Sequence, residues 1–195
     1  MTLRQRFWKL FYPVLLTADK ILKRNVKVLS NVGGARPGQS IFDLSLQLND
    51  GKILSLDQFR GKKVLLVNTA SNCAYTAQYS ELQKLQQYFG ERLAIIAFPS
   101  NDFKEQERGS DEEIASFCTT EYQVQFPLAH KSSVVKGKRQ NEVFKWLTDK
   151  SRNGWNTKQP SWNFSKYLIN EEGVLSHYFD PGISPTGHQV IKAIN

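Results

Sequence analysis

Cysteine, histidine and methionine are scarce in this sequence of 195 residues, which contains two Cys, three His and one Met. Two cysteines cannot form the disulfide framework of a small secreted domain, so reduced or redox-active thiols are the better interpretation. The histidines, His130, His177 and His188, are far apart in the chain, and none has metal-ligand spacing to either cysteine. We therefore expect no metal site.

The sequence also lacks an apolar run long enough to cross a membrane. Near its start, Leu10 to Leu16 form an apolar run, which is much shorter than the ~20 residues of a membrane-spanning helix. Arg4 and Arg6 could begin a signal peptide, but no convincing small-residue cleavage site follows. A signal peptide or an uncleaved anchor therefore stays an alternative for this segment.

Acidic residues are nearly absent from residues 1–38, which hold eight Lys or Arg and only Asp19, and so carry +7 of the net charge of +8. The remainder has 18 basic and 17 acidic residues. Because it has no basic stripe, we do not expect nucleic-acid binding. Phe7 and Trp8 lie among the positive charges, which fits a helix lying in an anionic membrane surface. A helix that packs on the domain, or a loosely ordered extension, is the other alternative.

The pattern predicts one domain over residues 39–195, after a basic, aromatic-rich extension and linker over residues 1–38. The turn Asn49-Asp50-Gly51 predicts an N-terminal hairpin, and Ser110 with Glu113 predicts a helix-capping box. The alternation of strand and helix over residues 63–98 predicts a right-handed βαβ unit with a parallel strand pair. Periodicity predicts strands at 41–48, 52–56, 63–70, 93–99, 126–130, 165–169 and 174–179, and helices at 76–89, 111–120, 139–150 and 184–194.

One cysteine, Cys73, follows the apolar run Val64 to Val67 and precedes the helical pattern that begins at Thr76. A thiol at this point would face the unpaired backbone N–H groups of the first helical turn, which favour a thiolate over a thiol. Because the thiolate is the nucleophilic form, this location indicates a reactive cysteine. Taken alone, Cys73 could equally be an inert buried thiol, since free cysteine packs as a small hydrophobic side chain.

Three separated segments carry the most specific pattern in the chain. They are residues 68–73 (Asn-Thr-Ala-Ser-Asn-Cys), 98–107 (Phe-Pro-Ser-Asn-Asp-Phe-Lys-Glu-Gln-Glu) and 161–164 (Ser-Trp-Asn-Phe). In order and spacing they resemble the three signature motifs of the glutathione peroxidases, and the resemblance extends over residues 40–180. It implies a thioredoxin-like α/β fold, with a mixed central sheet flanked by helices, that reduces hydroperoxides without haem, metal or another bound cofactor.

The resemblance assigns a catalytic role to four residues. Cys73 matches the peroxidatic position, and Gln106, Trp162 and Asn163 match the other members of a catalytic tetrad. Amide and indole N–H groups are neutral donors, which can stabilise a thiolate but do not quench it by proton transfer. The same donors can stabilise charge that develops on the peroxide oxygens. Each residue also has a plain alternative: Gln106 as a polar loop residue, Trp162 as a core aromatic and Asn163 as part of a strand entry.

The second cysteine, Cys118, lies in the helical segment that Ser110 opens. Many cysteine-containing members of the family have a resolving cysteine in this helix, so the resemblance implies that Cys118 attacks the oxidised Cys73 and that thioredoxin reduces the resulting disulfide. Cys118 could instead be a packing residue, because it shares one helix face with Ile114 and Phe117. The two roles are compatible if the helix unwinds during turnover.

Some motif positions depart from the usual family pattern. Ala74 and Arg108 stand where the family commonly has glycine and proline, which leaves the substrate preference open. The segment Ser151–Pro160, before Trp162, is short, whereas tetrameric members have a longer loop there. We therefore expect a monomer whose shallow rim admits bulky lipid hydroperoxides.

These observations together predict a thiol peroxidase that reduces hydrogen peroxide and organic or lipid hydroperoxides, with thioredoxin or glutathione as the reducing co-substrate. We expect it in the cytoplasm, with residues 1–38 as a potential contact to an anionic membrane surface. The non-enzymatic alternative is a membrane-surface redox sensor or adaptor that passes oxidation to a partner protein. A disulfide oxidoreductase of the thioredoxin type is disfavoured, because Cys73-Ala74-Tyr75-Thr76 lacks the second cysteine of a Cys-x-x-Cys motif.

Overall fold

The computed structural model describes residues 27–195. The predicted membrane contact concerns residues 1–38, of which residues 1–26 lie outside the described residues. Within the described residues, every helix is too short or too polar to span a lipid bilayer.

The centre of the domain is a mixed five-stranded sheet with the strand order β1-β7-β6-β4-β5. Strands β4 and β5 are parallel, and the other neighbouring strands are antiparallel. A separate antiparallel pair, β2–β3, forms the predicted N-terminal hairpin. The strand bounds are β1 Val28–Ser30, β2 Ser45–Gln47, β3 Ile53–Ser55, β4 Lys63–Thr69, β5 Leu93–Pro99, β6 Lys166–Ile169 and β7 Leu175–Phe179.

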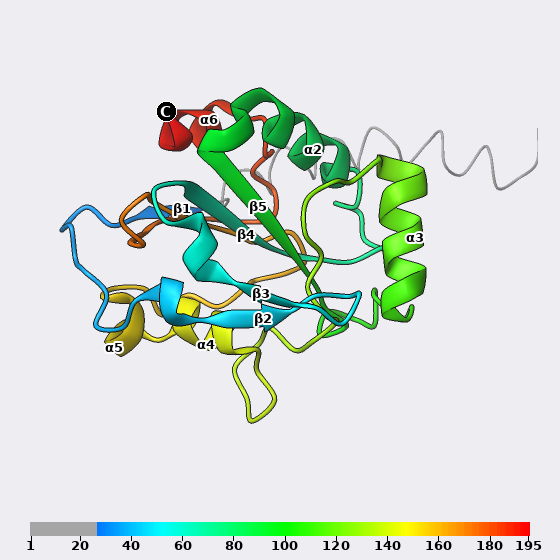
Figure 1. Cartoon of the computed structure of the whole chain (residues 1–195), viewed down its shortest axis with the longest axis horizontal. Helices are drawn as coiled ribbons and strands as arrows, with labels where there is room; N and C mark the ends of the chain where they lie inside the picture. Colours follow the sequence, from blue (N-terminus) through cyan, green and yellow to red (C-terminus); the bar gives the residue numbers. More distant parts are fainter. Residues whose placement is uncertain (1–26) are drawn as a thin grey trace, which may run out of the picture.

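Helices cover both faces of the sheet (Figure 1). Helices α2 (Gln78–Phe89), α3 (Asp111–Tyr122) and α6 (His188–Ile194) contribute to the core on one face, together with Leu65 and Val67 of β4. Helix α4 (Glu142–Thr148) and the hairpin cover the other face, where Val64 and Leu66 point. The short helix α5 (Lys150–Asn153) follows α4. Because successive residues of a strand face opposite sides, a strand covered on both faces has an unbroken apolar run, as β4 has from Val64 to Val67.

The predicted βαβ unit is confirmed: β4, α2 and β5 follow one another, and β4 pairs with β5 in parallel from Lys63 with Leu93 to Thr69 with Pro99. This arrangement places the end of β4, and the residues that follow it, at the carboxyl edge of the parallel pair. Loops at this edge are the usual location of a binding or catalytic site in such sheets.

Several predicted bounds differ from the structure. Residues 28–30, which the sequence analysis assigned to the extension, form the edge strand β1, because β7 supplies the partner that so short a segment needs. Residues 126–130 make only isolated bridges at Leu128 and Ala129. The helix predicted over 139–150 is two helices, since Asp149 has an extended backbone and its side chain caps α5. The last helix begins at His188, four residues later than predicted.

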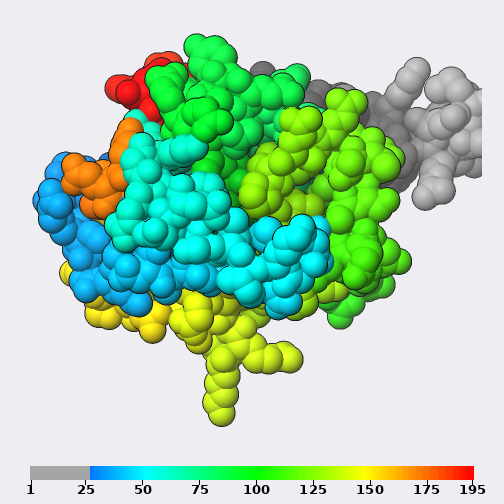
Figure 2. All heavy atoms as spheres, viewed as in Figure 1, coloured from blue at the N-terminus to red at the C-terminus, as the bar shows by residue number. Residues whose placement is uncertain are grey.

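Helix α3 begins as predicted, at a capping box. The Glu113 N–H donates to the Ser110 hydroxyl oxygen at 3.3 Å, and the Ser110 N–H donates to the Glu113 carboxylate at 2.7 Å. Between α3 and α4, a loop projects from the body of the molecule (Figure 2), and residues 136–139 in it are exposed. A bridge between Ser133 and Gln140 closes the base of this projection. The helix predicted to begin at residue 139 therefore begins only at Glu142.

Candidate active site

Cys73 lies in the turn between β4 and α2, and its side chain is partly exposed. The Thr76 hydroxyl holds this turn: it accepts the Cys73 N–H at 2.9 Å and donates to the Ala70 carbonyl oxygen at 3.0 Å. The Tyr75 N–H points at the Cys73 sulfur from 3.5 Å. Because α2 begins at Gln78 rather than at Thr76, the N–H group that reaches the sulfur belongs to the preceding turn, which corrects the predicted helix start.

Gln106 comes from the segment between β5 and α3. Lys104 and Glu105, directly before it, have φ angles of 52° and 53°, a left-handed conformation that non-glycine residues adopt only when the surroundings enforce it. The Asn72 N–H donates to the Gln106 carbonyl oxygen at 3.0 Å. The second predicted site residue is therefore joined through the backbone to the residue next to Cys73.

Asn163 is completely buried and lies against Gln106. Its side-chain Nδ2 donates to the Gln106 Oε1 at 3.0 Å. Among the described residues, the Asn163 Oδ1 has no hydrogen-bond partner although it is buried. An unpartnered buried acceptor is costly and is typical of a site that awaits a ligand or a water molecule. The structure thus brings two of the predicted amides into direct contact beside the Cys73 turn.

Trp162 is half-buried, with its ring 5.5 Å from the ring of Phe103 and the Lys104 ammonium 5.8 Å above it. Its backbone is held by Asn68 on β4, whose Nδ2 donates to the Trp162 carbonyl oxygen at 3.1 Å. Asn68 also accepts the Ser165 N–H at 3.1 Å. The strand that leads to Cys73 therefore holds the segment that carries the indole and the second amide.

Other buried polar groups lie on the segments that border the Cys73 turn. In the first turn of α2, Gln78 Oε1 has no hydrogen-bond partner among the described residues. The Tyr79 hydroxyl interacts with the Thr69 hydroxyl at the end of β4 and with the Cys118 thiol. Sequence reasoning gave none of these residues a role, because no sequence pattern marks a buried polar contact.

Glu107 is another residue to which sequence reasoning gave no role. Its side chain is buried, the Ser71 hydroxyl donates to its carboxylate at 3.1 Å, and its N–H donates to the Asn101 Oδ1 at 2.9 Å. Burial raises the pKa of this carboxyl group, because an ionised carboxylate is poorly solvated there. Among the other charged residues of this loop, nothing in the sequence marks this carboxyl group as buried.

Cys118 is fully buried in α3, in the core that α2, α3 and α6 form on one face of the sheet. Burial raises the pKa of its thiol to about 11, with a smaller contribution in the same direction from the Glu107 charge. The Tyr79 hydroxyl faces the thiol. At neutral pH the resting Cys118 is therefore a protonated, inaccessible thiol, which agrees with the packing role that the sequence analysis left open.

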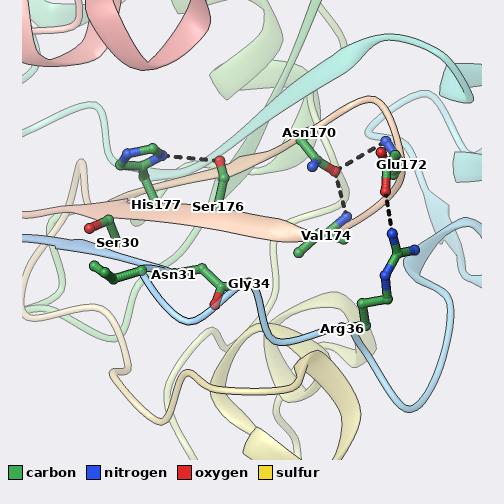
Figure 3. Close-up of a pocket in the computed structure, with 10 residues that line it drawn as sticks. Ser30, Asn31, Gly34, Arg36, Asn170, Glu172, Val174, Ser176 and His177 are labelled. Atoms are coloured by element: carbon green, nitrogen blue, oxygen red, sulfur yellow. Dashed lines mark hydrogen bonds and ion pairs between the residues drawn. The ribbon is translucent and has the colours of Figure 1, made fainter.

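Away from Cys73, we searched residues 27–195 for clusters of metal-ligating side chains and for cavities. No group of three or more His, Cys, Asp or Glu in residues 27–195 could hold a metal ion. A cavity of about 420 Å³ lies beside β1 and the turn between β6 and β7. In it, Arg36 and Glu172 form an ion pair at 3.2 Å, and Ser176 pairs with His177 (Figure 3). Because β6 ends there, opposite the start of β4, this cavity is at the far end of the sheet from Cys73.

Comparison with known proteins gives a consistent result. The sequence pattern of the family described as "Glutathione peroxidase" matches residues 41–148. The "Glutathione peroxidase homolog BsaA" of Staphylococcus epidermidis is 42% identical over 148 residues, which are 75% of this chain and 92% of that protein. The "Glutathione peroxidase-like peroxiredoxin 2" of Saccharomyces cerevisiae is 36% identical over 148 residues, 75% of this chain and 91% of that protein.

Among solved structures, apo Trgpx is similar with a TM-score of 0.61 and 27% identity, over 80% of this chain and 95% of that one. The sheet order, the parallel β4–α2–β5 unit and the flanking helices define a thioredoxin-like α/β fold, as predicted. The chain belongs to the glutathione peroxidase family and is a peroxidase. The individual roles of Cys73, Gln106, Trp162, Asn163 and Cys118 stay predictions.

Proposed function

We propose that the Cys73 thiolate is the nucleophile of this peroxidase and that its substrates are hydrogen peroxide and organic or lipid hydroperoxides. The sulfur attacks the terminal oxygen of ROOH, an S–O bond forms and the O–O bond breaks. Cys73 is oxidised to a sulfenic acid, and the leaving RO⁻ takes a proton from water to give ROH. The observation that carries this proposal is the hydrogen bond between Asn163 and Gln106, directly beside the turn that holds Cys73.

The amide and indole groups have a defined task in this reaction. Negative charge moves from sulfur to the departing oxygen as the O–O bond breaks, and neutral N–H donors fixed in advance stabilise it without reorganising. The Asn163 amide uses its nitrogen toward the Gln106 oxygen, so the N–H₂ end of Gln106 is directed away from Asn163. We propose that this end and the Trp162 indole act on the peroxide oxygens.

We further propose that Cys118 resolves the sulfenic acid and that thioredoxin, or glutathione in its place, restores the thiols. The Cys118 thiolate would attack the Cys73 sulfur, the hydroxyl group would leave as water after protonation, and a disulfide would form. Thioredoxin, as a dithiol, reduces this disulfide and becomes a disulfide itself, whereas glutathione needs two molecules, which end as glutathione disulfide. Since Cys118 is fully buried in α3, this step requires α3 to open locally.

Peroxide consumption by the purified full-length protein tests these roles, with thioredoxin and its reductase in one assay and glutathione in another. Cys73→Ser is expected to abolish turnover with both donors. The matched variant Cys118→Ser is expected to abolish turnover with thioredoxin while one round of Cys73 oxidation remains. Wild-type consumption by Cys73→Ser would refute the nucleophile, and normal turnover of Cys118→Ser with thioredoxin would refute the resolving role.

The proposed contact of residues 1–38 with an anionic membrane is supported by where this segment joins the domain. Val28 pairs with Phe179, Phe179 pairs with Lys166, and Lys166 pairs with Val67. Val67 is near the end of β4 that leads into the Cys73 turn. A membrane-bound extension would therefore hold the reactive end of the sheet near the lipid surface, where lipid hydroperoxides form.

Vesicles that contain phosphatidylserine and a phospholipid hydroperoxide test this contact against a soluble peroxide. Deleting residues 1–26 should slow reduction in vesicles and leave reduction of the soluble peroxide unchanged. As a matched control, the same 26 residues are attached after Asn195, because α6 ends beside Lys63 at the opposite end of β4. That variant should bind vesicles without recovering the rate. Failure of the full-length chain to bind anionic vesicles at low salt would end the membrane proposal.

A further inference from the structure

Lys166 is a completely buried lysine at the start of β6, in a strand whose four residues are all buried. Its ammonium donates to two backbone carbonyl oxygens, that of Phe164 at 2.7 Å and that of Pro181 at 3.3 Å. None of the ion pairs within residues 27–195 includes it. A buried cation without a directly paired anion is costly, so its retention calls for a reason.

Burial lowers the pKa of Lys166 to about 7, against smaller opposing contributions from Glu81 and Asp180. The amine is an N–H donor in both protonation states, so the two carbonyl contacts do not depend on its charge. What matters is therefore the identity of the two carbonyl groups that it holds.

The first carbonyl belongs to Phe164, the residue after Asn163. Phe164 has a φ angle of 66°, which a bulky residue adopts only when its surroundings hold it there. Its N–H donates to the Asn68 carbonyl oxygen at 2.6 Å, and its own carbonyl accepts from Lys166. Both polar groups of this strained residue are thus fixed, and the direction in which the chain presents Asn163 is fixed with them.

The second carbonyl, that of Pro181, also accepts from the Gln78 Nε2 at 2.7 Å. Gln78 is the first residue of α2 and follows the turn that holds Cys73. Lys166 therefore connects two parts of the candidate site. Through Pro181 it is linked to the start of α2, and through Phe164 to the segment that carries Trp162 and Asn163.

We propose that Lys166 is a positioning residue that holds the Trp162–Phe164 segment in register with the Cys73 turn. It touches none of the reacting atoms and acts through Phe164 and Pro181. This inference rests on the proposed function of Cys73, Trp162 and Asn163. Loss of Lys166 should therefore impair the step that needs the donors, which is cleavage of the O–O bond, more than a step that needs only the thiolate.

Two rate constants separate positioning from a merely structural role. In a Cys118→Ser background, where Cys73 is the single thiol, the rates of oxidation by hydrogen peroxide and of alkylation by iodoacetamide are measured by mass spectrometry. Alkylation needs the sulfur but no donor to a departing oxygen. For Lys166→Met, the ratio of oxidation to alkylation is expected to fall about tenfold or more, since a displacement of about 1 Å costs up to ~100-fold in an oriented reaction.

Lys63→Met is the matched control. Lys63 also donates from its ammonium to a backbone carbonyl, that of Ile194, but at the start of β4, away from Cys73. Its variant is expected to keep the wild-type ratio. Circular dichroism and thermal unfolding show which variants are folded at the assay temperature.

Lys166→Gln keeps an N–H donor on a shorter side chain. Its ratio of oxidation to alkylation is therefore expected to fall, but to stay several-fold higher than that of Lys166→Met. Where the methionine variant does not fold, the glutamine variant alone is compared with wild type, and its ratio is still expected to fall. An unchanged ratio in either folded variant, or an equal fall in Lys63→Met, overturns the positioning role. A parent protein whose Cys73 does not react with peroxide would instead refute the proposed function.

Discussion

The two cysteines occupy opposite environments in one small domain. Cys73 is partly exposed in a turn, with the Tyr75 N–H directed at its sulfur from 3.5 Å. Cys118 is fully buried in a regular helix, and burial raises the pKa of its thiol to about 11. The Cys73 thiol is accessible in the resting protein, whereas the Cys118 thiol is buried by the packing of α3. If both take part in turnover as proposed, the order of their reactions is imposed by the fold.

The largest effect that this comparison predicts is a difference in alkylation rate. At about pH 8, Cys73 should react with iodoacetamide on the order of 100-fold faster than Cys118, because Cys118 becomes reachable only in locally opened molecules. Mass spectrometry of the two cysteine peptides measures both rates in one sample, and unfolded protein gives the reference. Similar rates in the folded protein would show that Cys118 is exposed at rest.

The next effect concerns the donors beside Cys73. Gln106→Leu removes an amide that lies against Asn163, and should slow oxidation of Cys73 by hydrogen peroxide on the order of 100-fold, as the loss of one fixed donor to a developing charge does. Single-turnover oxidation measures the rate. The control is Gln58→Leu, because Gln58 is an exposed glutamine that donates to the Ser55 carbonyl oxygen in the hairpin region. Equal rates in the two variants would exclude Gln106 from the reaction.

A smaller effect should follow from weakening α3 without touching Cys118. Ser110→Ala removes the capping box, at a cost of about 1 kcal/mol to the helix, and should speed alkylation of Cys118 about fivefold if opening of α3 exposes it. Ser116→Ala, the same substitution on an exposed position of the same helix, is the control. Identical rates for both variants would indicate that the thiol is exposed by a different opening.

The smallest effect is a pH dependence of stability at Glu107, whose charge acts on Cys118 and whose carboxylate accepts from Ser71. The folded-state pKa of Glu107 is raised, so its contribution to stability is present below the unfolded pKa of about 4.3 and is lost as the pH rises through the folded value. Glu107→Gln should therefore gain stability relative to wild type between about pH 4 and pH 7. Urea unfolding at both pH values measures this, with the exposed neighbour Glu105→Gln as control. If the free energies of unfolding of Glu107→Gln and wild type differ by the same amount at both pH values, the carboxyl group is well solvated in the folded protein.

Local sequence signals predicted much of the fold. The apolar run at residues 93–99 determines β5, and the Ser110–Glu113 pair determines where α3 begins. Both signals come from residues close together in the chain, and the structure shows both as predicted. The start of α2 and the edge strand β1 differed because turn hydrogen bonds around Thr76 and the pairing with β7 decide them. Such long-range or side-chain contacts leave no periodic pattern.

The candidate site shows the same division. Short motifs identified the residues that carry the proposed chemistry, and the structure adds the contact between Gln106 and Asn163. The motifs did not reveal that Phe164 has a left-handed backbone or that Lys166 is buried. A lysine in a strand is ordinarily exposed, so its burial could be recognised only once β4 and β7 are placed on either side of β6.

The position of Trp162 gives the protein a built-in optical reporter. Its indole is half-buried beside Phe103 and Lys104, on the segment that Asn163 joins to Gln106. By contrast, Trp146 is fully buried, with its indole N–H bonded to the Gln39 carbonyl oxygen. If Cys73 is oxidised as proposed, the change should alter the emission of Trp162, while the buried Trp146 is shielded from it. Trp162→Phe then identifies the part of the signal that comes from Trp162 rather than from the other three tryptophans of the chain, and turnover can be followed in real time without a label.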